Sequence, residues 1–243
     1  MNKRGSHVGV VISFVIFVTF LVFLYTIISS LSVKEREKEY MVDYLIANLM
    51  NSSSETISTL VLNVNQPTGN NRYCINIQSI DIEQIPVEYR DNLLFKYGDQ
   101  ALSYKLQNIN TIWVKIPQEH FQGIILVQFS ESITPNMDET MSGCDPHPYP
   151  MGDIKEITNI FESMLYELAE MHETNYEEFK EFLGLSPDLD FNFYVLNAER
   201  EIVISAVHAE PPRSESVYVE EVPLQYVDEE GNIYFGFLKV EIW

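Results

Sequence analysis

The chain has 243 residues, with 15 Lys and Arg against 36 Asp and Glu, so its formal net charge is −21. This excess of carboxylates excludes nucleic acid and anionic lipid headgroups as partners of the bulk of the surface, because both would be repelled. At this length the chain can bury a sizeable core, and it contains two cysteines, Cys74 and Cys144.

The first element along the chain is a long uncharged segment. Residues 8–33 carry no charged side chain and are interrupted only by Gly, Ser and Thr. As a helix with a rise of about 1.5 Å per residue, they span roughly 39 Å, enough to cross a hydrocarbon core of about 30 Å with some tilt. A secretory signal has an apolar core of only about 7–15 residues. We therefore predict a transmembrane helix that contacts the lipid bilayer, in preference to a signal cleaved near Ser30-Leu31-Ser32.

The orientation of this span is predicted from the rest of the chain. Lys3 and Arg4 precede the span and three basic residues follow it closely, so the positive-inside count is nearly balanced. Residues 34–243 contain all 36 carboxylates against 13 Lys and Arg (15 minus 2), a balance of −23. They also contain both cysteines, an even number, as expected outside the reducing cytosol. We expect a cytoplasmic N-terminus and an extracytoplasmic main domain, attached to the cell membrane by a single span.

The helix is expected to continue beyond the membrane surface. Residues 34–50 are good helix formers without Gly or Pro, and apolar residues recur at helical spacing from Met41 to Leu49. One helix over residues 8–50, on the order of 65 Å long, is predicted to lie half in lipid and half on a soluble domain. The polar run NSSSET at 51–56 indicates a loop at its end.

Residues 55–135 are predicted to form a β-rich domain. Short runs rich in Ile, Val, Leu, Tyr and Phe alternate with turn-forming segments, as in small sandwiches or barrels. The predicted strands are residues 56–64, 72–80, 92–97, 101–109, 111–116 and 123–130. The stretch 136–152 has no such pattern and is predicted to be an irregular linker.

Helical spacing appears after this linker. Apolar residues such as Ile154, Ile157 and Phe161 predict a helix over residues 153–173. Thr174-Asn175-Tyr176-Glu177 matches a capping box at the start of a second, short helix.

Two β-hairpins are predicted at the C-terminal end. Gly184 is expected to end the second helix, and residues 190–207 have the pattern of a hairpin. Residues 216–243 have the same pattern, with Gly231 near the turn, and Pro223 is expected on an edge strand or at a bulge.

The predicted fold class is α+β. It consists of a long N-terminal transmembrane helix followed by a β-rich, sandwich-like ectodomain with a helical pair and C-terminal hairpins. The predicted parts are a leader peptide at 1–5, a transmembrane helix with an amphipathic extension at 6–50, a β-rich domain at 55–135, a linker at 136–152, and helices plus hairpins at 153–243.

No catalytic signature accompanies this fold. The sequence contains no Gly-x-Ser-x-Gly, no phosphate-binding glycine loop and no His-Glu-x-x-His. The carboxylates between Glu167 and Glu178 are better explained as a solvated helix face than as paired acid and base groups. We expect neither an enzymatic activity nor a cofactor.

The cysteines favour a structural role. Cys144 and His147 have a Cys-x-x-His spacing, but a structural zinc site uses four ligands and the remaining candidates are scattered, so no metal site is predicted. Cys74 and Cys144 are expected to form a disulfide, with two free thiols as the alternative. Asn51, in the triplet Asn51-Ser52-Ser53, is a candidate glycosylation site.

The first six residues carry a further motif. The basic pair Lys3-Arg4 precedes Gly5 and Ser6, and a short spacer then leads into the uncharged helix. This arrangement resembles the N-terminus of type IV pilin-like precursors, particularly the class III signal peptides of archaea. The resemblance covers about the first 50 residues. The chain departs from the pattern at Val10, the fifth mature position, where many pilins have Glu.

The resemblance implies a processing and assembly route. A prepilin-type peptidase of the membrane would cut on the cytoplasmic side between Gly5 and Ser6. The retained helix would anchor the subunit and pack with like subunits or other pilin-like proteins. The predicted function is a membrane-anchored extracytoplasmic subunit of a type IV pilus-like surface structure. The alternative is an unprocessed single-pass protein that displays an acidic binding or adhesion ectodomain.

Overall fold

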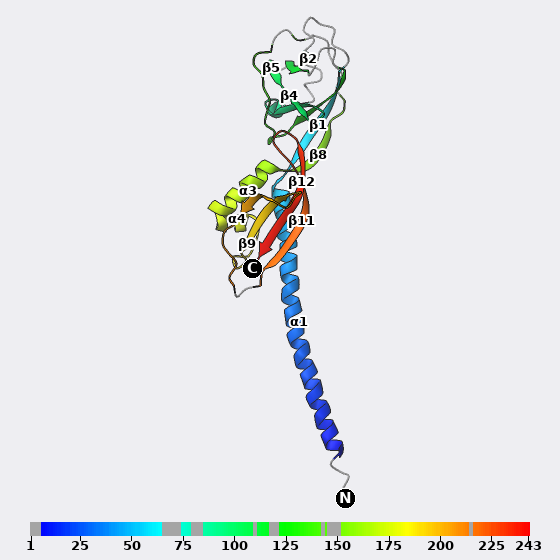
Figure 1. Cartoon of the computed structure of the whole chain (residues 1–243), viewed down its shortest axis with the longest axis vertical. Helices are drawn as coiled ribbons and strands as arrows, with labels where there is room; N and C mark the ends of the chain where they lie inside the picture. The colour runs from blue at the N-terminus through cyan, green and yellow to red at the C-terminus, as the bar shows by residue number, and fades with distance from the viewer. Residues whose placement is uncertain are drawn as a thin grey trace.

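The computed structural model shows an elongated molecule with a long helix, α1 (Ser6–Ser52), at one end (Figure 1). A proximal lobe packs against the C-terminal part of α1, and a distal lobe lies at the far end of the molecule. The residues described are 6–64, 74–78, 85–108, 111–116, 122–141, 144, 152–213 and 216–243, with the backbone alone described at 6–8 and 27–37.

The elements divide between the lobes in chain order. The distal lobe contains β1 (Ser54–Val64), β2 (Cys74–Gln78), the 3-10 helix η2 (Val87–Tyr89), β3 (Leu93–Tyr97), β4 (Gln100–Leu102), β5 (Tyr104–Asn108), β6 (Thr111–Lys115) and β7 (Gly123–Phe129). The chain returns along β8 (Lys155–Phe161) to the proximal lobe, which contains α3 (Glu162–Thr174), α4 (Tyr176–Phe182), β9 (Phe191–Asn197), β10 (Ile202–Ala206), β11 (Tyr218–Val227) and β12 (Ile233–Ile242). The predicted α+β fold class is thus confirmed.

One nine-stranded sheet runs through both lobes in the order β10-β9-β12-β11-β8-β1-β7-β3-β4. Its narrowest junction joins β11 to β8, where only Tyr226 and Val227 pair with Ile160 and Phe161, in parallel. On either side of this junction the described pairings are antiparallel. The sheet therefore consists of two antiparallel halves, one in each lobe.

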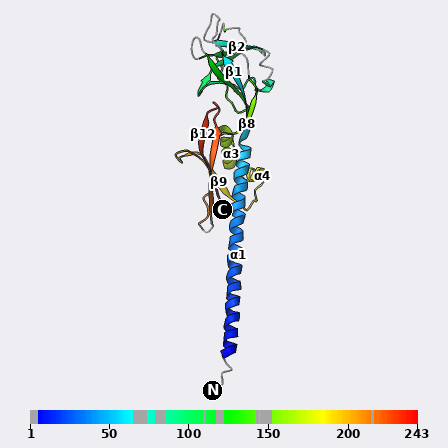
Figure 2. The same cartoon turned by 90° about the vertical axis from the view of Figure 1, so that its right-hand side faces the viewer.

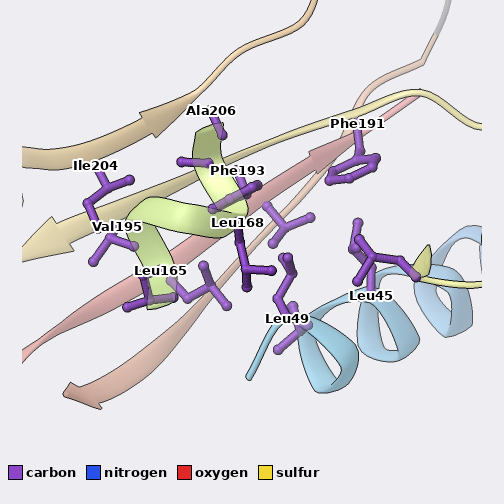
Figure 3. Close-up of a cluster of buried hydrophobic side chains, with 14 of the residues drawn as sticks. Leu45, Leu49, Leu165, Leu168, Phe191, Phe193, Val195, Ile204 and Ala206 are labelled. Carbon is purple, nitrogen blue, oxygen red and sulfur yellow. The ribbon is translucent and has the colours of Figure 1, made fainter. Parts of the chain in front are cut away.

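The core of the proximal lobe includes α1. Val42, Leu45, Ile46 and Leu49 follow helical spacing and are almost fully buried. Leu45 and Leu49 point toward side chains of α3, β9 and β10, and these strands lie across from the helices (Figures 2 and 3). The prediction that the C-terminal part of α1 packs on the folded domain is confirmed.

The distal lobe is the predicted sandwich. The three-stranded sheet β2-β6-β5 faces the distal half of the large sheet. Buried side chains from both sheets form one cluster, among them Ile75 of β2, Tyr104 of β5 and Val127 of β7.

The two lobes are tied together at the β11–β12 turn. The Nζ atom of Lys96, on β3, donates hydrogen bonds to the carbonyls of Glu230 (3.2 Å) and Gly231 (3.0 Å) and to Oδ1 of Asn232 (2.9 Å). Gly231 has a φ of +69°, and a Cβ there would lie 2.7 Å from Cδ2 of Leu94. The predicted turn glycine is therefore required by its backbone conformation, and it lies against side chains of the distal lobe.

The predicted helix over 153–173 is wrong in its first part. Residues 155–161 form β8, paired antiparallel with β1, and the helix begins only at Glu162. Three of these residues, Ile157, Thr158 and Ile160, are β-branched and favour a strand. Pairing with β1 outweighs the helical spacing of the apolar side chains.

Two further local predictions need correction. The capping box does not form, because Oγ1 of Thr174 donates to the carbonyl of Glu170 (2.7 Å) and Asn175 makes no side-chain cap. The expected loop at 51–56 shrinks to one residue, Ser53, whose hydroxyl donates to the carbonyl of Leu49 (2.8 Å). The chain thus passes from α1 almost directly into β1.

The C-terminal predictions are confirmed. Gly184 ends α4 with a φ of +69°, and the amide of Leu185 donates to the carbonyl of Lys180 (2.9 Å), as in a Schellman motif. Both hairpins form, β9 with β10 and β11 with β12. Pro223 lies where β11 pairs with β12 alone, which is an edge position.

Candidate functional site

The candidate functional site is the part of α1 that extends beyond the proximal lobe. Gly9–Thr26 is long and apolar enough to cross a membrane, and none of these residues is buried in the molecule. At about 1.5 Å per residue the segment spans roughly 27 Å, close to the thickness of a hydrocarbon core. The chain therefore has an N-terminal apolar helix of the kind that serves as a signal or an anchor.

The two threonines of this segment are suited to apolar surroundings. Oγ1 of Thr19 donates to the carbonyls of Val15 (3.0 Å) and Ile16 (2.9 Å), and Oγ1 of Thr26 donates to the carbonyl of Phe23 (2.8 Å). Their hydroxyls are thus satisfied within the helix, as a hydrocarbon environment requires.

The residues of the predicted processing site are only partly visible. α1 begins at Ser6. Lys3, Arg4 and Gly5 lie outside the described residues, so the predicted cut between Gly5 and Ser6 stays a prediction.

Hydrogen bonds and a close contact join α1 to the proximal lobe. Nζ of Lys38 donates to the carbonyl of Ser216 (2.7 Å), and Nδ2 of Asn48 donates to the carbonyl of Leu183 (3.1 Å). The hydroxyl of Tyr44 lies against Gly184, where a Cβ would be 2.8 Å from it. These contacts join α1 to both the β11 and the α4 sides of the lobe.

The proximal lobe is acidic where α1 leaves it. Desolvation beside α1, followed by the negative charges of Asp43 and Glu39, raises the pKa of Glu220 above its ordinary value. Such a surface does not attract anionic headgroups, in agreement with the charge balance of the chain.

The predicted disulfide between Cys74 and Cys144 is confirmed. Their Cα atoms are 5.0 Å apart, and the bond joins residues 70 positions apart in sequence. The alternative of two free thiols is excluded. A structural disulfide of this kind indicates a secreted or membrane-anchored protein.

Asn51, the candidate glycosylation site, lies exposed in the last turn of α1. Ser53, the third residue of the triplet, is buried. Glycosylation stays a prediction.

Four glutamates surround a hollow of about 420 Å³ at the joint between the lobes: Glu55, Glu131, Glu167 and Glu229. The carboxylate of Glu55 is already occupied, since it accepts hydrogen bonds from the hydroxyls of Ser130 and Ser132 and from the amide of Glu131. Within the described ranges, no group of three or more His, Cys, Asp or Glu is arranged to hold a metal ion.

His172 is a buried titratable residue that the sequence did not single out. It lies on α3 with no exposed surface, and its Nε2 atom is 2.9 Å from the carbonyl of Phe191. Its Nδ1 atom is buried without a hydrogen-bond partner. The surrounding rings are those of Tyr176, Phe179, Phe191, Phe193 and His208. Burial in this cage lowers the pKa of His172 to about 4, although the bond to Phe191 partly opposes the shift.

We expect His172 to make the proximal lobe sensitive to acid. Because its pKa is lower in the folded than in the unfolded chain, the unfolded chain binds the proton first as the pH falls. The free energy of unfolding should therefore have its full value above about pH 6.5. It should decrease by about 3 kcal/mol as the pH falls to 4, because the unfolded chain then binds a proton that folded His172 does not. Urea denaturation at several pH values, followed by circular dichroism, measures this slope.

The matched control is His172→Gln, which keeps a hydrogen-bond donor near Phe191 but does not titrate. Its unfolding free energy should decrease less than that of the wild type between pH 6.5 and 4, since the contribution of His172 is absent. Identical slopes in the two proteins would show that His172 does not bind its proton on unfolding.

Comparisons with known proteins add no relative. No protein-family model matches the chain, and it matches neither a curated protein nor a solved structure. The function must therefore be inferred from the residues and the fold themselves.

Proposed function

We propose that the chain is a membrane-anchored, extracytoplasmic, pilin-like subunit without enzymatic activity. The observation that carries this proposal is the division of one continuous helix. Residues 9–26 are apolar and exposed, whereas Val42, Leu45, Ile46 and Leu49 belong to the core of the proximal lobe. A helix that is both anchor and core element suits a subunit that assembles through this helix.

Processing at the predicted position rests on the basic pair Lys3-Arg4 ahead of Gly5 and Ser6. The exposed wall of Val, Ile, Leu and Phe that follows suits contact with lipid or with neighbouring helices of the same kind. In this proposal the N-terminus is cytoplasmic and both lobes are outside the cell, as the disulfide and the charge balance favour.

A second candidate is an unprocessed single-pass protein that displays a binding ectodomain. The observation in its favour is the position of the distal lobe, which α1 and the proximal lobe hold far from the exposed helix (Figure 1). In this candidate α1 is an anchor only, and the distal lobe contacts the ligand.

Mass spectrometry of the N-terminal peptide of membrane-extracted protein distinguishes these candidates. The pilin-like proposal expects a chain that begins at Ser6. A chain that begins at Met1 or Asn2 would refute it and leave the single-pass protein. A chain that begins near Val33 would refute both and indicate a secreted domain.

Two glycine variants sharpen this test. Gly5→Leu should abolish the cut, because the residue before the predicted scissile bond is changed. Gly9→Leu is the matched control, since a Cβ at Gly9 meets no atom within 4 Å and the helix tolerates it. Equal processing of the two variants would contradict a cut after Gly5.

A further inference from the structure

The sheet of the proximal lobe has one covered and one open face. α1, α3 and α4 lie on one side of β10-β9-β12-β11 (Figure 2). On the other side, within the described part of the chain, no helix or strand covers the sheet. We call this side the outer face; its residues are Asn192, Tyr194, Leu196, Ile202, Ser205, Val219, Glu221, Pro223, Gln225, Phe235, Phe237, Lys239 and Glu241. Asn192 is buried at one corner of this face, where its side chain bonds to the backbone of His208 and Ala209.

An apolar row crosses the outer face over all four strands. Ile202 is opposite Leu196, Leu196 is opposite Phe237, and Phe237 is opposite Pro223. Phe235 lies two residues from Phe237 on the same face and is 65% exposed, and Ile202 is 60% exposed. Leu196, at the centre of the row, is itself covered by its neighbours. A solvated sheet face is normally polar, so an apolar row of this kind indicates an interaction surface.

A hollow of about 420 Å³ lies beside Phe235. Its lining is almost entirely apolar and consists of Ala198, Pro223, Leu224, Gln225, Phe235, Gly236 and Phe237. A Cβ at Gly236 would be 2.0 Å from the carbonyl oxygen of Leu196, so no other residue fits there without moving the strands. The outer face therefore presents a protruding aromatic ring next to an apolar hollow.

The charges of the outer face balance. Arg200 pairs with Glu221 (3.0 Å) and Lys239 pairs with Glu241 (2.6 Å). The same cations lie over aromatic rings, Arg200 over Phe237 and Lys239 over Tyr194. Elsewhere the balance of residues 34–243 is −23, so two copies of the chain repel each other over most of their surface but not here.

We infer that the outer face binds the outer face of a second copy of this chain. The twofold axis is parallel to α1, so both exposed helices point the same way and enter one membrane. Phe235 of each copy occupies the hollow of the other, as an isologous contact allows. The parallel arrangement of the two helices rests on the proposed function, in which α1 is a membrane anchor. The contact between the two outer faces does not depend on that proposal.

The size of the outer face fits such a contact. Four strands about 4.8 Å apart present a flat area on the order of 500 Å², and the protruding side chains add to the accessible surface. Two such faces together offer about 1,000 Å², which reaches the total buried area of about 1,000 Å² that a specific interface needs. A basic protein partner would instead be attracted to the acidic remainder of the chain, which favours a second copy at this neutral face.

The test is thiol crosslinking of the full chain in native membranes. Because Cys74 and Cys144 are bonded to each other, an introduced cysteine is the only free thiol of this chain. Gln225→Cys, at the hollow, should give a crosslinked homodimer with a short bismaleimide. Tyr166→Cys, exposed on α3 on the covered side, is the control and should give none. Equal crosslinking of the two variants, or none in either, would overturn the inference.

A second variant confirms the role of the aromatic ring. Adding Phe235→Glu to Gln225→Cys should reduce crosslinking about tenfold, because a carboxylate is placed in an apolar hollow. At a dilution where the chain is monomeric, the thermal unfolding midpoint should stay unchanged, since Phe235 is exposed in one copy. Unchanged crosslinking would refute the contact.

Failure of this inference is separable from failure of the proposed function. The start of the chain is determined by mass spectrometry on the same membranes. An unprocessed chain that still crosslinks through Gln225→Cys refutes the pilin-like proposal and keeps the contact. A chain that begins at Ser6 but gives no specific crosslinking keeps the pilin-like proposal and refutes the contact.

Discussion

A chain that begins at Asn51 is expected not to fold its proximal lobe, whereas a chain that begins at Glu37 is expected to fold both lobes. The shorter chain lacks Val42, Leu45, Ile46 and Leu49, which are almost fully buried. Burial of each such side chain contributes about 1.5–3 kcal/mol, or roughly 6–12 kcal/mol together. The net stability of a domain is only about 5–15 kcal/mol, so their loss removes most or all of it.

Circular dichroism melting and amide hydrogen exchange of the two soluble chains measure this effect. The longer chain should protect the amides of β9 and β12, and the shorter one should exchange them rapidly. Equal protection would show that α1 contributes little to the core. The same result decides how ectodomain binding is assayed, because a ligand test on a chain lacking residues 1–50 would examine a damaged lobe.

Removal of the Cys74–Cys144 disulfide is expected to destabilise the distal lobe by about 4 kcal/mol. The bond joins residues 70 positions apart, and closing so long a loop restricts the unfolded chain strongly in the chain-entropy model. For a lobe of this size the unfolding midpoint should fall by on the order of 20 °C. Differential scanning calorimetry of Cys74→Ala/Cys144→Ala against the wild type measures it.

Reduction of the wild type provides the control for the double variant. Both should lower the distal transition equally, because both remove the same constraint. The proximal lobe contains neither cysteine, and its protection from amide exchange should change less. If the unfolding free energy of the distal lobe decreased by less than about 1 kcal/mol, the disulfide would not restrict the unfolded chain appreciably. The unfolded chain would then already be compact without the bond.

The elements recovered from sequence are those defined by local signals. The length and lack of charge of residues 8–33 predict α1, and Gly184 and Gly231 fall at positions with positive φ, as turn chemistry predicts. The pairing of Cys74 with Cys144 needed no geometry, since only two cysteines are present. Hairpins such as β11–β12 are likewise local, because the two strands are adjacent in the chain.

The errors come from contacts between distant parts of the chain. The segment 155–161 matched a helix by the spacing of Ile157 and Phe161, and its pairing with β1, about 100 residues earlier, is not encoded locally. The nine-stranded sheet depends on the same pairing. The aromatic cage of His172 also combines α3, α4 and β9, so its low pKa has no signal in the sequence.

Local signals predict one part of the candidate surfaces and miss the part that depends on contacts between distant segments. The apolar half of α1 is evident from composition alone. The outer face is not, since its apolar row combines Ile202, Leu196, Phe237 and Pro223 from four strands. Alternation along a single strand gives the face of each residue but not which neighbour completes the row.

The single residue between α1 and β1 has a mechanical consequence. Tension between the distal lobe and a membrane would pass from β1 through Ser53 into α1, with no flexible linker to take up the extension. The first part of β1, residues 54–59, is hydrogen-bonded to β8, and the second part, residues 58–64, is hydrogen-bonded to β7. A pull along β1 loads these bonds together, in shear, instead of one after another. A force applied to β1 would therefore reach α1 directly, because only Ser53 separates the two elements.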